Sequence, residues 1–193
     1  MAQRILIIDG HPDSDPARLI HALASSYMEG ARAGGHAVRR VNIAELEFDL
    51  IGSTYDWHGA YVPSDIRHAQ TAIAWASHLV ILFPLWLGDM PALLKGFLEQ
   101  VMRPGFAIDE KGEASSMGML RGRSARIVTT MAMPASVYRL HYGAHSVKNL
   151  ELNILRFIGI EPVEATLYGD AGTSAQDCAA WLNDMRRLGE NAA

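Results

Sequence analysis

Short apolar runs alternate with helix-like segments along the whole chain. The first run, RILIID (Arg4–Asp9), ends at a glycine and predicts a buried strand. The same kind of pattern predicts four further strands, at 36–43, 79–83, 124–130 and 163–168. The run at 79–83 is fully apolar, whereas the one at 36–43 alternates with polar residues and is expected nearer a sheet edge.

Apolar residues between these runs recur at helical spacing. They predict helices at 17–34, 63–76, from residue 91 onward, at 145–157 and at 174–188. Pro91 suits the first turn of its helix, and the pair Gly34-Gly35 ends the first one. The residues expected on the buried sides of the third and last helices are Leu94, Phe97, Leu98, Val101, Cys178, Leu182, Met185 and Leu188. Two long loops are expected, at 44–64 and 103–122.

Strands that alternate with helices predict a parallel sheet covered on both faces. The chain is therefore expected to form one α/β domain over residues 1–193, with a doubly wound five-stranded parallel sheet. The order 2-1-3-4-5 of flavodoxin-like folds is the expected one. Ligands of such sheets bind at the carboxyl ends of the strands, so the loops after Asp9, Phe83 and Thr130 are the candidate site.

Composition narrows the class of protein. Hydrophobic residues make up 49% and charged residues 20% of the 193 positions, which is ordinary for a globular protein. The net charge of −4 argues against a nucleic-acid partner. The longest apolar run, 79–87, is too short for a membrane span, and the N-terminus lacks a signal-peptide pattern. A single cysteine, Cys178, excludes an internal disulfide and a cysteine-rich metal site, so we expect no metal and a cytoplasmic location.

The loop after the first strand reads GHPDSDPARL and carries none of the glycine-rich phosphate signatures. A helix that begins near Pro16 still presents free backbone N–H groups and a positive dipole end, which suit a phosphate. Arg18 would add a cation and His11 a donor. The alternative is that Ser14 or Asp15 only caps the helix.

The loop after the third strand, FPLWLGD, is unusually apolar for its position. Pro84 has no N–H, which leaves those of Leu85, Trp86 and Leu87 to find acceptors. A flavin needs donors at the polar edge of its ring system and an apolar surface beside it, and this loop offers both. The alternative is that Trp86 and Leu87 belong to the core or to a subunit contact.

The loop after the fourth strand brings Thr129, Thr130, Tyr138, His141 and His145 to the same edge. Threonine hydroxyls can donate to ring oxygens, and tyrosine and histidine can hold a proton near a reducible carbonyl. A lone histidine is more often structural or simply exposed than catalytic. Two histidines and a tyrosine within eight residues make a catalytic role more plausible here.

Three segments together carry a family resemblance: ILIIDGHPD, FPLWLGDMPALLKGFLEQVMRPGFAI and a later TT…Y…H. In this order, over about residues 4 to 188, the chain resembles the flavodoxin-like NAD(P)H:quinone oxidoreductases. The resemblance implies a homodimeric flavoenzyme that binds FAD or FMN. It would pass a hydride from NADH or NADPH to a quinone, azo or nitroaromatic acceptor by a ping-pong mechanism.

The resemblance also implies roles for individual residues. The residues that would hold the flavin are His11, Ser14, Pro16, Ala17, Arg18, Pro84, Leu85, Trp86, Leu87, Thr129 and Thr130. Tyr138 and His145 match the pair that the family places over the flavin for proton transfer, and Phe106 matches a loop that reaches the partner subunit's active site. Trp57, with Tyr61, is expected to close the pocket, although the role of the 55–61 segment is otherwise open.

The chain departs from the family pattern at two places. Pro16-Ala17-Arg18 stands where the family often has Ser-Phe-Asn, and Met131-Ala132 follows the threonines where it often has Gly-Gly. The bulk of Met131 would narrow the space over the ring and change the substrate range. Other function classes also stay open: a regulatory subunit of a potassium-efflux transporter, a one-electron carrier, and a flavin-free domain.

Overall fold

A computed structural model describes residues 2–59, 61–109, 118–171 and 174–193. Its five strands form one sheet in the order β2-β1-β3-β4-β5, and every neighbouring pair is parallel. The strands are β1 (Arg4–Asp9), β2 (Ala37–Asn42), β3 (His78–Pro84), β4 (Ser124–Thr130) and β5 (Val163–Tyr168). The predicted fold class, strand order and edge position of the second strand are confirmed.

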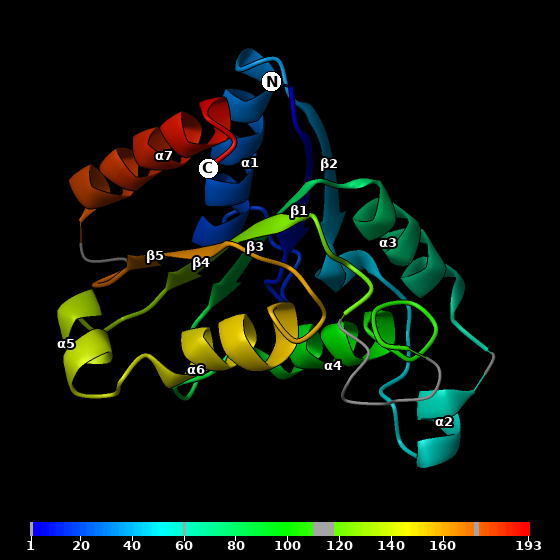
Figure 1. The fold of residues 1–193 in the computed structure, drawn as a ribbon. Helices are drawn as coiled ribbons and strands as arrows, with labels where there is room; N and C mark the ends of the chain where they lie inside the picture. Colours follow the sequence, from blue (N-terminus) through cyan, green and yellow to red (C-terminus); the bar gives the residue numbers. More distant parts are fainter. Residues whose placement is uncertain (1, 60, 110–117, 172–173) are drawn as a thin grey trace.

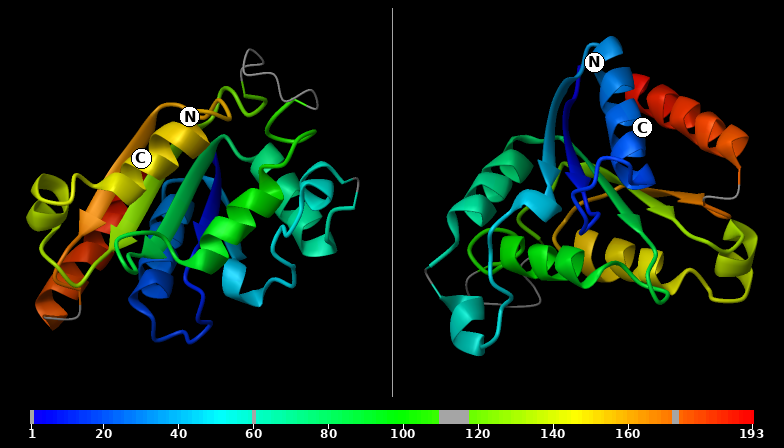
Figure 2. Two further views of the ribbon diagram at one scale, coloured as in Figure 1. Left: turned by 90° about the horizontal axis from the view of Figure 1, so that it is seen from below. Right: turned by 180° about the vertical axis from the view of Figure 1, so that it is seen from behind.

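Helices cover both faces of this sheet, as Figures 1 and 2 show. One face carries α1 and α7, and the other carries α3, α4 and α6. The helices are α1 (Leu19–Ala33), α2 (Thr54–His58), α3 (Ser64–Trp75), α4 (Ala92–Val101), α5 (Ala135–Leu140), α6 (His145–Lys148) and α7 (Ala175–Glu190), with a 3-10 turn η1 (Ile43–Glu45) and a π-helix η2 (Asn149–Leu155). No described helix is both long and apolar enough to cross a bilayer.

The central strand β3 is buried along its whole length because helices pack on both sides of it. Its side chains alternate between the two cores: Leu79 and Ile81 face α3 and α4, whereas Val80 and Leu82 face α1 and α7. This explains why its sequence is continuously apolar rather than alternating. The four residues expected on the inner side of α4 are all buried, as predicted.

Helix α1 begins two residues later than predicted, because the preceding residues are used in a turn. The side chain of Asp15 accepts the N–H of Ala17 at 3.0 Å, and the backbone of Arg18 is extended. The predicted helix at 145–157 is present as α6 and η2, but its second half is a π-helix.

Two short helices were not predicted. The helix α2 buries no residue and α5 buries only Tyr138, so neither has an apolar period that a sequence pattern could reveal. Ser53 caps α2 by accepting the N–H of Asp56.

The predicted buried face of α7 was too broad. Only Met185 of the four expected residues is buried, whereas Cys178, Leu182 and Leu188 are half-exposed. The reason is that α7 contacts α1 along a narrow line of close backbone approach. A side chain at Gly30 would lie 1.9 Å from the carbonyl oxygen of Arg186.

Candidate functional site

Three loops meet at the carboxyl edge of the sheet. The N–H of Gly10 donates to the carbonyl of Leu82 at 2.7 Å, and that of Leu85 donates to the carbonyl of Thr130 at 2.8 Å. The rings of His11 and Trp86 lie edge to face with their centres 5.9 Å apart. The loops after β1, β3 and β4 therefore form one surface.

The loop after β3 is a tight turn closed by its own backbone. The N–H of Trp86 donates to the carbonyl of Asp89 at 2.8 Å, and the N–H of Asp89 returns to Trp86 at 3.0 Å. With Leu85 bound to Thr130, two of the three N–H groups expected to face a ligand are used within the protein. Within the described part of the chain, the N–H of Leu87 has no protein acceptor, and it is the one that stays available.

Leu87 is unusual in both its conformation and its exposure. Its φ is 50°, a region that costs a leucine about 1–2 kcal/mol, and its side chain is fully exposed. Trp86 beside it is 49% exposed. The loop after β4 adds further exposed apolar side chains, those of Val137, Leu140 and Tyr142. Apolar side chains held outward at a strand end are typical of a surface that something covers.

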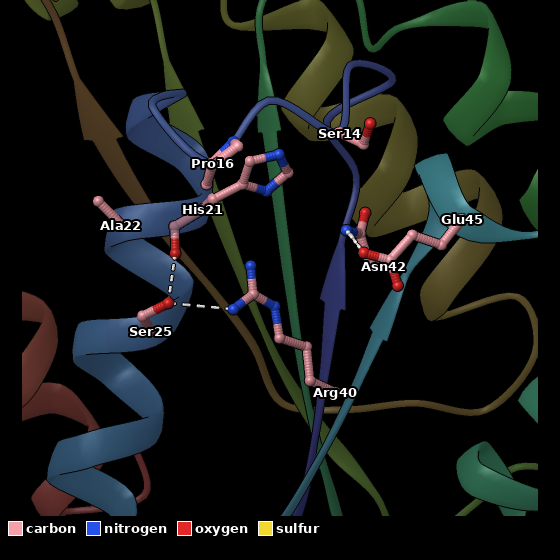
Figure 3. Close-up of a pocket in the computed structure, with 8 residues that line it drawn as sticks. All are labelled: Ser14, Pro16, His21, Ala22, Ser25, Arg40, Asn42 and Glu45. Carbon is pink, nitrogen blue, oxygen red and sulfur yellow. Dashed lines mark hydrogen bonds between the residues drawn. The ribbon is translucent and has the colours of Figure 1, made fainter.

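A buried network of charged side chains holds the loop after β1, and the sequence pattern did not predict it. Asp9 is fully buried, and its Oδ2 receives His21 Nδ1 at 2.7 Å and a guanidinium nitrogen of Arg40. Its Oδ1 accepts the N–H of His11 at 3.3 Å. Figure 3 shows His21 and Ser25 from α1 and Arg40 from β2 turned toward one another. The available signal was a histidine within the apolar stripe of α1.

The outer side of the same loop carries an exposed ionic cluster. Arg18 binds Asp13 at 2.7 Å and Asp15 at 3.3 Å. No side chain caps α1, and among the described residues no protein acceptor binds the N–H groups of Leu19 and Ile20. The capping alternative for Ser14 or Asp15 is therefore wrong, because Asp15 bonds the turn instead. Ser14 and Pro16 border a cavity of about 390 Å³ that His21 and Arg40 also line (Figure 3).

Tyr138 and His145 differ sharply in their surroundings. The Tyr138 ring is buried, and its hydroxyl makes no hydrogen bond of normal geometry with any described residue. Burial raises the pKa of Tyr138, so the hydroxyl keeps its proton at neutral pH. His145 is exposed and packs over Gly143, where a side chain would lie 3.0 Å from its Nε2. The Thr129 hydroxyl is likewise buried without a partner among the described residues.

Of the three residues expected in the substrate pocket, Trp57 and Phe106 lie apart from these loops, whereas Met131 begins the loop after β4. Met131 is buried, and its N–H donates to the carbonyl of Tyr168 at 2.9 Å. Trp57 lines an apolar cavity of about 510 Å³ beside α4 and η2, and Phe106 lines a separate one of about 540 Å³. Figures 1 and 2 place α2, which carries Trp57, at the opposite end of the molecule from α5.

Comparison with known proteins agrees with the fold described above. A family model described as a flavodoxin-like fold matches residues 3–188. The chain belongs to this flavodoxin-like family.

Several proteins named for an activity are similar to this chain over most of its length. An uncharacterized NAD(P)H oxidoreductase of Haemophilus influenzae is 30% identical over 170 residues, covering 86% of this chain and 83% of that protein. The FMN-dependent NADH:quinone oxidoreductase 8 of Burkholderia lata is 25% identical, covering 86% and 83%. The solved structure of an NAD(P)H:quinone oxidoreductase from Methanothermobacter marburgensis superposes with a TM-score of 0.80 at 18% identity, covering 100% and 98%, and supports the fold.

The residues at this edge of the flavodoxin-like sheet fit a flavin. The uncapped start of α1 suits its phosphate, since Arg18 neutralises part of the charge of Asp13 and Asp15. The exposed side chains of Trp86 and Leu87 suit an apolar ring system, and the N–H of Leu87 suits the polar atoms of its edge.

Proposed function

We propose that this protein is a flavin-dependent NAD(P)H oxidoreductase that reduces a quinone or a similar electron-poor acceptor. The observation that carries the proposal is the exposed Trp86-Leu87 turn at the end of β3, next to the uncapped start of α1. An apolar surface beside an anion-binding helix end matches the two halves of a flavin nucleotide. The activities named for the relatives from Haemophilus influenzae and Burkholderia lata support the same class.

In this proposal the whole chain is one flavin-binding domain. The flavin phosphate would lie on the turn formed by Ser14, Pro16, Ala17 and Arg18, with His11 behind it. The ring would lie along Pro84, Leu85, Trp86 and Leu87, next to Thr129 and Thr130. We propose FMN as the bound flavin, because the Burkholderia lata relative is FMN-dependent. FAD remains the alternative to be separated by analysis of the bound cofactor.

The bound flavin would supply the two-electron chemistry, taking a hydride from NADH or NADPH and passing it to the acceptor. Donor and acceptor would occupy the same surface in turn, as in a ping-pong cycle. The task of the chain is then to orient each substrate against the ring and to exclude water. Trp86 and Leu87 would do both, because their side chains border the ring without competing polar groups.

Tyr138 and His145 would serve the acceptor oxygen. Tyr138 keeps its proton because its pKa is raised by burial, so it can donate a hydrogen bond to developing negative charge. Its hydroxyl is enclosed by protein, and its side chain would have to turn outward to reach a substrate. His145 is already exposed at this edge.

A homodimer would complete the site. Trp57 and Phe106 line cavities that the loops after β1, β3 and β4 do not border, so we assign them to the pocket of a partner rather than to their own. The face formed by α4 and η2 exposes Leu152 and Phe157 beside an apolar cavity. We place the protein in the cytoplasm, because NAD(P)H is available there and a single cysteine fits a reducing compartment.

The decisive experiment is an absorption spectrum of the purified protein, followed by chromatography of what acid releases. Flavin bands are expected, and the released nucleotide distinguishes FMN from FAD. Bleaching by NADH and by NADPH, and recolouring by quinone, azo and nitroaromatic compounds, would identify donor and acceptor. A colourless protein that takes up no added flavin would contradict the proposal and leave only the fold in common.

The roles of Tyr138 and His145 are tested by the double variant Tyr138→Phe/His145→Ala. Quinone reduction should slow by roughly a hundredfold, the usual scale for loss of general acid catalysis, while the flavin dissociation constant changes little. His141→Ala is the matched control, since His141 is an exposed histidine on the same loop, with its ring edge to face with that of Tyr142. Equal turnover in the double variant and the wild type would remove the assigned roles.

A further inference from the structure

The hydrogen bonds around Asp9 determine its ionisation. Its Oδ2 accepts from His21 and from the guanidinium of Arg40, and its Oδ1 accepts the N–H of His11. Arginine and a backbone N–H can only donate. Both carboxylate oxygens therefore act as acceptors, and Asp9 is an anion in spite of its complete burial.

The protonation of His21 follows from the same reasoning. Its Nδ1 lies 2.7 Å from the Asp9 carboxylate, and its Nε2 lies 2.8 Å from the carbonyl oxygen of Asp13. Both partners are pure acceptors, so both ring nitrogens must carry a proton for the two hydrogen bonds to form. If His21 carried only one proton, one of its two ring nitrogens would face an acceptor with a lone pair, and that hydrogen bond could not form.

The chain of hydrogen bonds continues to His11. His11 Nδ1 lies 3.0 Å from the N–H of Asp13, which donates to it, and 3.1 Å from the carbonyl oxygen of the same residue. Burial and the neighbouring His21 lower the pKa of His11, in keeping with a neutral ring. The backbone of Asp13 thus links a doubly protonated His21, through its carbonyl oxygen, to a neutral His11, through its N–H.

The net charge of these residues indicates how the loop would interact with a phosphate. The buried network holds the anion of Asp9 and the cations of Arg40 and His21, a net charge of +1. The exposed cluster of Asp13, Asp15 and Arg18 has a net charge of −1. Without the second proton of His21 the loop would be negative as a whole, and it would repel a phosphate. The hydroxyl of Ser25 accepts a hydrogen bond from Arg40, and Glu45 lines the same cavity as His21.

We infer that His21 is a positioning residue for the cofactor phosphate, which it prepares through the loop rather than by contact. Held with two protons between Asp9 and Asp13, it fixes the 11–18 loop and balances the loop's acidic residues. This inference rests on the proposed flavin site.

The first test measures the proton count directly, without any cofactor. Long-range ¹H–¹⁵N spectra of the ¹⁵N-histidine-labelled full chain at pH 7.5 should show both His21 nitrogens protonated. His21→Gln assigns the signals, and His36 is an internal reference at the other end of α1, since its Nδ1 accepts the N–H of Gln3. A neutral His21 ring at this pH would overturn the inference, whether or not the protein binds flavin.

The second test compares FMN with riboflavin, which lacks the phosphate. In His21→Gln the FMN dissociation constant should rise roughly ten- to a hundredfold, because the 11–18 loop loses the hydrogen bond between His21 and the carbonyl of Asp13 that holds it in place. The riboflavin constant should change little, and His36→Gln should alter neither.

The outcomes separate the two proposals. Equal FMN affinity in wild type and His21→Gln would overturn the role of His21 while leaving the flavin site intact. A wild type that binds neither FMN nor riboflavin would contradict the proposed function instead. If His21→Gln does not fold, the spectra of the wild type still decide, because they do not need the variant's affinity.

Discussion

The loops after β1 and β3 leave neighbouring strands of the sheet but are built in opposite ways. The first is held by side chains: Asp9, His21 and Arg40 below it, and Arg18 with two aspartates above it. The second is held by its own backbone, through the reciprocal bonds of Trp86 and Asp89. Its apolar side chains are consequently free to face outward.

The difference shows how one edge can suit both parts of an amphipathic ligand. A charged group is best met by donors that are already oriented, which requires buried partners to hold them. A flat apolar ring needs little orientation but does need surface that water leaves readily. The two designs therefore predict different responses to mutation: loss of stability in the first loop and loss of affinity in the second.

The largest effect is expected for Asp9→Asn. The substitution leaves the cations of Arg40 and His21 without their anion in a buried setting, which should lower the free energy of unfolding by about 3–5 kcal/mol. Urea denaturation of the flavin-free protein measures it. Glu99→Gln, which alters the exposed pair with Lys95, should stay within about 0.5 kcal/mol and serves as the control. A comparably small change at Asp9 would mean that the network contributes little to stability.

The next effect is expected for Trp86→Ala. Removing the half-exposed indole should weaken flavin binding by roughly tenfold, the scale of one aromatic stacking contact, with little change in unfolding. Titration of flavin fluorescence and a denaturation curve test the two parts. Trp75→Ala should behave in the reverse way, because this indole packs under Arg39 and against the core rather than at the site. An unchanged flavin affinity in Trp86→Ala would contradict the expectation that mutations in the second loop lower affinity.

A smaller effect is expected for Leu87→Asn. Asparagine tolerates the left-handed backbone better than leucine, so the free energy of unfolding should stay equal or rise by up to about 1 kcal/mol. Flavin affinity should nevertheless fall, since an apolar contact is lost. Leu140→Asn is the control for an exposed leucine with ordinary helical backbone, where no gain in stability is expected. A loss of stability at Leu87 would mean that its side chain supports the turn.

The smallest effect is a pH dependence confined to the first loop. Burial and His21 lower the pKa of His11 below its ordinary value of 6.5, so the unfolded state binds the proton more tightly. Stability from His11 is thus present above pH 6.5 and is lost as pH falls below it. Unfolding curves at pH 7 and pH 5.5 should converge for wild type and His11→Gln, with His58→Gln, at an exposed position, as the control. A difference that widens toward low pH would contradict the assignment.

Much of the fold could be predicted because burial leaves a period in the sequence. The five strands and the long helices each bury an apolar run or stripe, and these were found to within a few residues. The helices α2 and α5 were missed since they bury one residue between them. The narrow contact of α7 was missed because Gly30 and Gly189, rather than large side chains, determine it.

The same distinction between predictable and unpredictable features applies to the candidate site. Sequence alone determined that three loops would meet at the carboxyl edge, because parallel strands place their ends together. It also determined that one of these loops would be apolar. Only the tertiary structure decided which N–H groups remain available and that Tyr138 is enclosed. It likewise joined Asp9, His21 and Arg40. These facts depend on contacts between residues far apart in the chain, and such contacts have no period that a sequence can display.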